Sequence, residues 1–187
     1  MRAFATLLMC SALALGVGSG CSAPATAGLV VIPPEQRVMA PEVVGPGLRG
    51  GTVDLADFRG QAVVVNAFAS WCPPCQQELP LLARLHDGGL MVLGLDVEDV
   101  PEAARGTLDA VEARFPVILD PRGDVLSLFH GPTQGIPQSI LIDEQGRVAG
   151  YLIGPADADT LRVVRDVLLP RGQSPGQAPP VDPSAPR

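Results

Sequence analysis

The fold is decided by residues 62–75, which read AVVVNAFASWCPPC. Residues 62–69 are nearly all apolar, which is typical of a central strand covered on both faces. The cysteines then open a leucine-rich helical stretch, so a strand is predicted to lead directly into a helix. This junction places Cys72 and Cys75 on the first helical turn, where unpaired backbone amides favour a thiolate. The arrangement suits thiol–disulfide exchange.

The two cysteines are predicted to have different roles. Cys72 is expected to be the exposed nucleophile, because a helix N-terminus lowers a thiol pKa from about 8.5 to between about 3.5 and 7.5. Cys75 lies one turn further in and is expected to attack the mixed disulfide and release the partner. Pro73 and Pro74 lack an N–H, which limits thiolate stabilisation and weakly favours a reductant.

The rest of the chain predicts strands and helices in alternation. A helix over 73–86 stops at two glycines, and 62–95 forms a strand–helix–strand unit with an expected right-handed crossover. A short strand of an N-terminal hairpin is predicted at 52–55, and the last helix is amphipathic. The other predicted elements are strands over 90–95, 115–120, 139–142 and 147–153, and helices over 101–114, 125–129 and 158–169.

Two motifs resemble the TlpA/ResA branch of the thioredoxin-like oxidoreductases. One is WCPPC followed by QQELP at 71–80, and the other is GIPQSILID at 135–143. The resemblance covers roughly residues 40–168. It implies an α/β thioredoxin-like fold, with a central mixed sheet flanked by helices, an N-terminal β-hairpin and a TlpA-type insertion between Leu95 and Pro137.

The resemblance also assigns residues around the cysteines. Pro137 matches the cis-proline opposite the cysteines, so the main chain of Ile136 is expected to dock an extended substrate strand. Glu78 matches a glutamate that influences cysteine titration in the ResA branch. Because Asn66 cannot titrate, Glu78 is the candidate proton shuttle for Cys75, with an exposed helix-start glutamate as the alternative.

Three further residues are candidates for a role near the cysteines. Trp71 is expected on the partner-docking rim, with plain packing as the alternative. A zinc site is disfavoured, because His86 and His130 are the only histidines and there is no second Cys-x-x-Cys pair. The redox-active pair is therefore expected to be Cys72–Cys75, with no metal and no bound cofactor.

The chain ends predict export. Residues 1–27 read as an export signal, processed either at the lipobox-like Cys21, which would be lipidated, or after Ala27. An uncleaved anchor is the third alternative. Residues 28–40 are predicted to be a linker, 41–170 the thioredoxin-like domain, and 171–187 a disordered proline-rich tail. The domain is expected outside the cytoplasm, in the periplasm or at the cell surface, anchored through Cys21 or secreted in soluble form.

The formal net charge of −7, without a basic patch, argues against nucleic-acid binding. The resemblance implies reduction of disulfides in exported proteins, through mixed disulfides, for cytochrome c or copper-site maturation. A membrane reductant of the DsbD/CcdA kind is expected to regenerate the dithiol. The alternatives are a Dsb-type oxidase or isomerase, a thiol peroxidase and a copper-carrying module. Alanine at position 69, where peroxiredoxins have threonine, disfavours the peroxidase.

Overall fold

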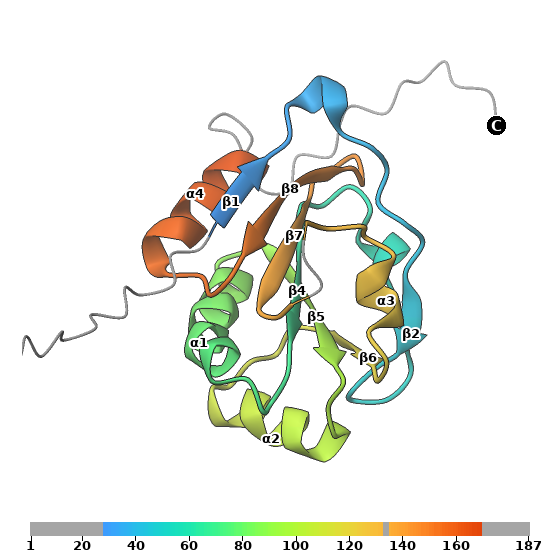
Figure 1. The fold of residues 1–187 in the computed structure, drawn as a ribbon, viewed down its shortest axis with the longest axis vertical. Helices are drawn as coiled ribbons and strands as arrows, with labels where there is room; N and C mark the ends of the chain where they lie inside the picture. The colour runs from blue at the N-terminus through green and yellow to red at the C-terminus, as the bar shows by residue number, and fades with distance from the viewer. Residues whose placement is uncertain (1–27, 133–134, 170–187) are drawn as a thin grey trace, which may run out of the picture.

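A six-stranded mixed sheet forms the centre of the computed structural model, which describes residues 28–132 and 135–169. Its strand order is β1-β8-β7-β4-β5-β6 (Figure 1). The central strand β4 pairs in parallel with β5 and antiparallel with β7. The strands are β1 (Gly28–Val31), β4 (Val63–Phe68), β5 (Met91–Val97), β6 (Val117–Asp120), β7 (Gln138–Ile142) and β8 (Val148–Ile153).

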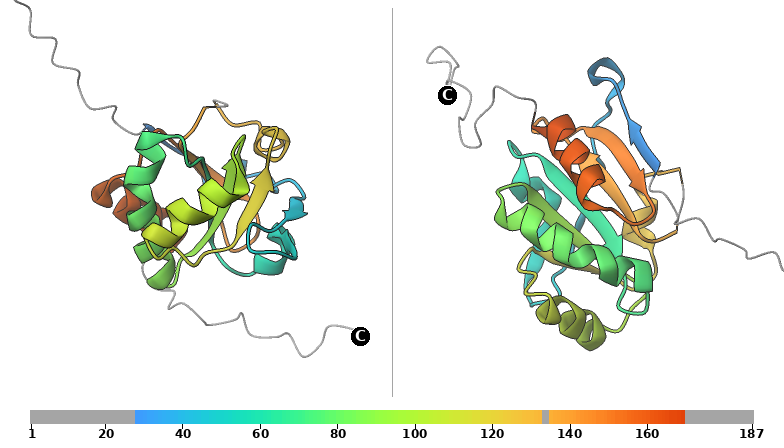
Figure 2. Two further views of the ribbon diagram at one scale, coloured as in Figure 1. Left: turned by 90° about the horizontal axis from the view of Figure 1, so that it is seen from below. Right: turned by 90° about the vertical axis from the view of Figure 1, so that its left-hand side faces the viewer.

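The two faces of the sheet are covered differently. The helices α1 (Pro73–Asp87), α2 (Pro101–Ala110) and α4 (Ala158–Leu168) pack their apolar residues into one core cluster. The right-hand view of Figure 2 shows α1 and α4 together on this face. The opposite face is covered by α3 (Asp124–Ser127), the 3₁₀ turn η2 (Leu55–Phe58) and the segment before it.

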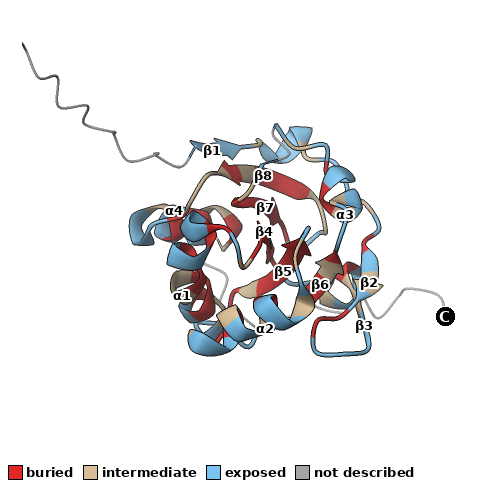
Figure 3. Cartoon of the chain, turned by 60° about the horizontal axis from the view of Figure 1, so that its bottom comes forward, coloured by how far each residue is buried: buried red, intermediate tan, exposed pale blue. Residues whose placement is uncertain are grey.

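Because the sheet is sandwiched, β4 is buried along its whole length, which explains its unbroken apolar run. Figure 3 shows the consequence, with the central strands buried and the outer faces of the helices exposed. The predicted thioredoxin-like α/β fold is therefore confirmed. The expected hairpin is β2 (Val44–Pro46) with β3 (Thr52–Asp54), and α2, β6 and α3 lie between Leu95 and Pro137, the segment in which the insertion is expected.

The prediction of a linker over residues 28–40 was wrong. Strand β1 pairs antiparallel with β8, and the 3₁₀ turn η1 (Pro34–Gln36) follows it. The segment continues along the sheet, because Val148 N–H donates to the Val38 carbonyl and Met39 bridges to Arg147. The prolines of residues 28–40 suggested a flexible spacer. Strand β1 is nevertheless held in place by its backbone pairing with the edge of β8. Residues 28–40 are therefore part of the domain.

Smaller differences concern element ends. The helix predicted over 101–114 ends at Ala110, and Gly106 does not interrupt it. The strand predicted to stop at Leu95 continues to Val97, which brings Asp96 into the sheet. Helix α1 continues through Pro80. No helix within the described residues is long and apolar enough to cross a membrane. The export signal and the proline-rich tail lie outside those residues.

Two glycine substitutions test the pairing of β1. A Cβ at Gly150 would collide with the Val30 carbonyl oxygen, so Gly150→Ala is expected to displace β1 and lower the free energy of unfolding by about 1–3 kcal/mol. Gly106 is the matched control, because a Cβ there meets open space and alanine should stabilise the helix by about 0.5–1 kcal/mol. Chemical denaturation measures both changes. Equal stability of the two variants would contradict the packing of β1.

Candidate active site

The cysteine pair lies where β4 leads into α1. Cys72 is the N-cap of α1 and forms a disulfide with Cys75, with an S–S distance of 2.07 Å. The Cys72 sulfur also accepts a hydrogen bond from the Cys75 backbone N–H at 3.2 Å. The helix terminus therefore directs a backbone donor at the sulfur of the first cysteine, as the strand-to-helix junction predicted.

The expectation of an exposed Cys72 needs correction. Cys72 is only 4% exposed, against 0% for Cys75, and both belong to the apolar cluster on the α1 face. Cys72 is still the more accessible of the two, but a partner must reach a nearly buried sulfur. The Cys72 sulfur is bonded to that of the fully buried Cys75, which places it within this cluster.

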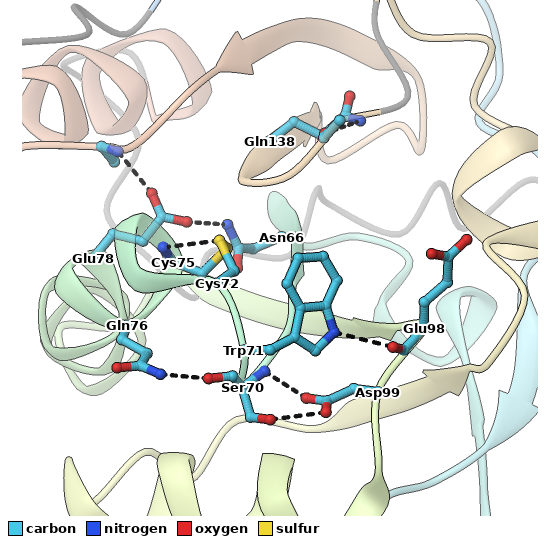
Figure 4. Close-up of a disulfide and its surroundings, with 12 residues drawn as sticks. Asn66, Ser70, Trp71, Cys72, Cys75, Gln76, Glu78, Glu98, Asp99 and Gln138 are labelled. Carbon is cyan, nitrogen blue, oxygen red and sulfur yellow. Dashed lines mark hydrogen bonds between the residues drawn. A yellow bond between two sulfur atoms is a disulfide. The ribbon is translucent and has the colours of Figure 1, made fainter.

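Glu78 is buried in α1, so the exposed-glutamate alternative was wrong. It is 1% exposed, and its carboxylate accepts the Asn66 side-chain amide at 2.8 Å and the Ala156 backbone N–H at 2.7 Å (Figure 4). Burial raises its pKa to about 7, although both hydrogen bonds favour the charged form. A carboxyl that titrates near neutral pH thus lies three residues from Cys75, on the same face of α1.

Asn66 links the sheet to this carboxyl. Its side-chain amide donates to Glu78 and, at 3.1 Å, to the Ser139 hydroxyl on β7. Within the described residues its Oδ1 atom has no hydrogen-bond donor. Asn66 is therefore an uncharged residue near the cysteines. The group with which it is hydrogen-bonded and which can titrate is Glu78.

The turn that carries Trp71 and Cys72 is fastened to the end of β5. The Asp99 carboxylate accepts the Ser70 N–H and the Ser70 hydroxyl, the latter at 2.8 Å. The Trp71 indole N–H donates to the Glu98 carbonyl oxygen at 3.0 Å, as Figure 4 shows. Trp71 remains 58% exposed, which agrees with a position on the rim rather than in the core.

Ile136 and Pro137 lie on the segment leading into β7. The Ile136–Pro137 peptide bond is cis, as the sequence predicted. Ile136 packs against the cluster that contains both cysteines. Trp71 and Ile136 also line a common pocket of about 250 Å³, together with Val97, Glu98 and residues of the α3 region. The structure therefore brings together Trp71, Cys72, Cys75, Glu78 and Ile136, while Cys21 lies outside the described residues.

His86 and His130 do not join this site. His86 packs edge-on against Phe115 at the end of α1, and His130 is exposed after α3. Within residues 28–132 and 135–169, no group of three or more His, Cys, Asp or Glu side chains is arranged to hold a metal ion.

Sequence reasoning missed Asp96, Asp99 and Ser70. Asp96 is buried at the end of β5, where the Asp99 carboxylate reaches Ser70. One available signal was a lone acid in an otherwise apolar strand, since a buried carboxylate requires a partner. Because the strand was predicted to end at Leu95, Asp96 was not recognised as part of it.

Comparisons with known proteins agree on the chemistry. The model of the AhpC/TSA family matches residues 37–151. The thiol-disulfide oxidoreductase ResA of Bacillus thuringiensis subsp. konkukian is 29% identical over 135 residues, which cover 70% of this chain and 77% of ResA. The thiol:disulfide interchange protein HelX of Rhodobacter capsulatus is 32% identical over 115 residues, covering 61% of this chain and 65% of HelX.

Solved structures agree as well. A DsbF homologue from Corynebacterium diphtheriae superposes with a TM-score of 0.69 at 27% identity, covering 78% of this chain and 96% of that structure. A secreted thiol-disulfide isomerase from Corynebacterium glutamicum gives a TM-score of 0.68 at 27% identity, with 79% and 93% covered.

Proposed function

Because the chain belongs to the AhpC/TSA family and is a thiol–disulfide oxidoreductase with a thioredoxin-like fold, we propose that it reduces disulfides of exported proteins through Cys72 and Cys75. The observation that carries the proposal is the Cys72–Cys75 disulfide at the N-terminus of α1. The Cys75 backbone N–H donates to the Cys72 sulfur, and the pKa of the nearby Glu78 carboxyl is about 7. No bound cofactor is required, because the dithiol supplies two electrons and two protons.

The proposed reaction has two steps. The Cys72 thiolate attacks one sulfur of the partner disulfide, and the other partner sulfur leaves and takes up a proton. The Cys75 thiol then loses its proton to the Glu78 carboxylate and attacks the Cys72 sulfur. The Cys72–Cys75 bond forms, the mixed disulfide breaks, and the second partner sulfur leaves with a proton.

Docking is proposed to use the rim of the site. The main chain of Ile136, before the cis-proline, is proposed to pair with an extended partner segment beside Trp71. Their shared pocket supports this assignment, because Trp71, which lines it, directly precedes Cys72. Cytochrome c or copper-site cysteines of exported proteins are the proposed partner class, and a membrane protein of the DsbD/CcdA kind is proposed to regenerate the dithiol.

An extracytoplasmic location forms part of the proposal. The structural relative from Corynebacterium glutamicum is described as secreted, and the N-terminal residues read as an export signal. Lipidation at Cys21 would anchor the domain to a membrane, and cleavage after Ala27 would release it.

The direction of electron flow is tested by the reduction potential. Since Pro73 and Pro74 offer no N–H to the Cys72 sulfur, we expect a potential nearer the about −270 mV of thioredoxin than the about −120 mV of DsbA. Equilibration with glutathione, followed by thiol alkylation, measures it. Pro74→Ala restores a donor on the first turn and should raise the potential by about 30 mV, a tenfold change in equilibrium. A wild-type value near −120 mV would instead support the Dsb-type oxidase.

A further inference from the structure

The pocket of about 250 Å³ that Trp71 and Ile136 share has mainly apolar walls. The side chains of Val97 and Leu126, which also line it, are buried, whereas Trp71 is exposed. Because Trp71 directly precedes Cys72, a partner segment docked at the Cys72 sulfur lies next to this pocket. The pocket can therefore receive a side chain that neighbours the cysteine of the partner.

Two charged residues line the pocket, and only one of them is neutralised. The Arg122 guanidinium forms an ion pair with the Asp124 carboxylate, with an Nε–Oδ2 distance of 2.7 Å. Within the part of the chain that the structure describes, the exposed Glu98 carboxylate has no hydrogen-bond or ion-pair partner. The uncompensated charge of the pocket is therefore negative.

The backbone of Glu98 is held on both sides. Its N–H donates to the Asp120 carbonyl at 3.1 Å, and its carbonyl accepts the Trp71 indole N–H at 3.0 Å. The Oε1 atom lies 3.8 Å from the position that a Cβ on Gly123 would take, at the start of α3. In Figure 4 the Glu98 side chain extends past the indole, on the side away from the disulfide. The carboxylate and the indole thus face a common space.

The conformation of Glu98 indicates that its side chain serves a purpose other than stability. Its φ angle is 51°, in the left-handed region that favours glycine and asparagine. A glutamate is a poor choice for such a backbone, and its exposed side chain adds no burial to offset the strain. Strained residues of this kind are concentrated at functional sites.

We propose that Glu98 and Trp71 determine specificity by binding a lysine or arginine side chain of the partner, two residues from the cysteine that Cys72 attacks. The carboxylate supplies the opposite charge, the indole binds the cation, and Val97 and Leu126 contact the apolar stem. In an extended segment, side chains two residues apart lie on the same face, about 7 Å from each other. The inference rests on the proposed exchange at Cys72 and names a feature of its substrates.

Short peptides that differ only in charge test the inference. Each has a central cysteine, glycine on both sides of it, and lysine, glutamine or glutamate at both ends. The cysteine is joined in a disulfide to thionitrobenzoate. The Cys72 thiolate of the reduced protein attacks the peptide sulfur, a Cys72–peptide disulfide forms, and thionitrobenzoate leaves as a coloured thiolate. Stopped-flow absorbance gives each rate, which is divided by the rate of the same peptide with uncharged mercaptoethanol.

We expect the lysine peptide to react about fivefold faster than the glutamine peptide at low salt, because an ion pair and a cation–π contact add to docking. Glu98→Gln should remove most of this preference, and Glu98→Lys should favour the glutamate peptide. Glu102→Gln is the matched control, because it removes an exposed carboxylate outside the pocket. It should keep the preference, which separates the pocket from steering by the net charge of −7.

Equal rates for the lysine and glutamate peptides would overturn the inference, as would a preference that persists in Glu98→Gln shown by circular dichroism to be folded. A faster glutamate peptide in the wild type would instead assign the pocket to acidic side chains through Arg122. If no peptide reacts, the proposed exchange itself fails. The preference can then still be measured from Trp71, the only tryptophan, by titrating the oxidised protein with serine versions of the peptides and following its fluorescence.

Discussion

Replacement of Cys75 by alanine is expected to turn the protein into a covalent trap. Without the second thiol, the mixed disulfide between Cys72 and a partner has no internal attacker. The lifetime of the complex should then lengthen from roughly seconds to roughly hours, the range of uncatalysed disulfide exchange. Expression of the variant in the parent cell, followed by acid quenching and non-reducing electrophoresis, measures the complexes, and mass spectrometry identifies the partners.

The matched control is Cys72→Ala. Cys75 is fully buried, so its thiol should capture few partners, and disulfide reduction by either variant should fall to the background rate. Equal trapping by the two variants would show that attacker and resolver are wrongly assigned. Trapped exported proteins with paired cysteines would support the proposed partner class.

Removal of the Glu78 carboxyl is the second change with a large expected effect. The folded-state pKa of Glu78 is about 7, above its ordinary value of 4.5, so the folded protein binds the proton more tightly than the unfolded chain. Its stabilising effect is complete below about pH 4.5 and is lost as the pH rises through about 7, a change of about 3 kcal/mol. Glu78→Gln should remove this part of the pH dependence of unfolding.

The same variant should alter the chemistry. If the Glu78 carboxylate accepts the Cys75 proton, glutamine should slow the resolving step by up to about 100-fold and remove its inflection near pH 7. Stopped-flow measurement of mixed-disulfide breakdown tests this expectation. An unchanged pH–rate profile in a folded variant would reduce Glu78 to a structural role.

Asp143 offers a control of opposite sign. Burial alone would raise its pKa, but hydrogen bonds from Arg147 and Arg37 hold it below its ordinary value. Its contribution to stability is therefore present above the unfolded pKa and lost as the pH falls through the lower folded value. Asp143→Asn should change the pH dependence of the free energy of unfolding on the acid side and leave its pH dependence in the neutral range unchanged.

Much of the fold could be predicted because one strand and its neighbours carry strong patterns. The apolar run of β4, the cysteines at the helix start and the proline before β7 are local signals, and each lies where expected. Strand β1 was missed although Leu29, Val30 and Val31 are apolar, because prolines follow it closely and its pairing depends on the distant strand β8.

The site was predicted only as far as sequence spacing allowed. The i,i+3 spacing placed Glu78 near Cys75, but its burial depends on Asn66 and on Ala156, which lies 78 residues away. The fastening of Ser70 by Asp99 joins the ends of two parallel strands, which sequence distance does not reveal. Long-range polar contacts of this kind require the three-dimensional arrangement.

If Cys21 is lipidated as proposed, the pairing of β1 also determines how close the cysteine end of the domain lies to a bilayer. Gly28 lies in one row with Ile153, Gln138 and Ala67, three strand spacings or about 14 Å from the strand that feeds the cysteine helix. Cys21 precedes Gly28 by seven residues, and a fully extended segment of that length spans at most about 25 Å. A lipid on Cys21 would therefore hold the end of the domain that carries Cys72 close to the lipid headgroups, within reach of the proposed membrane reductant.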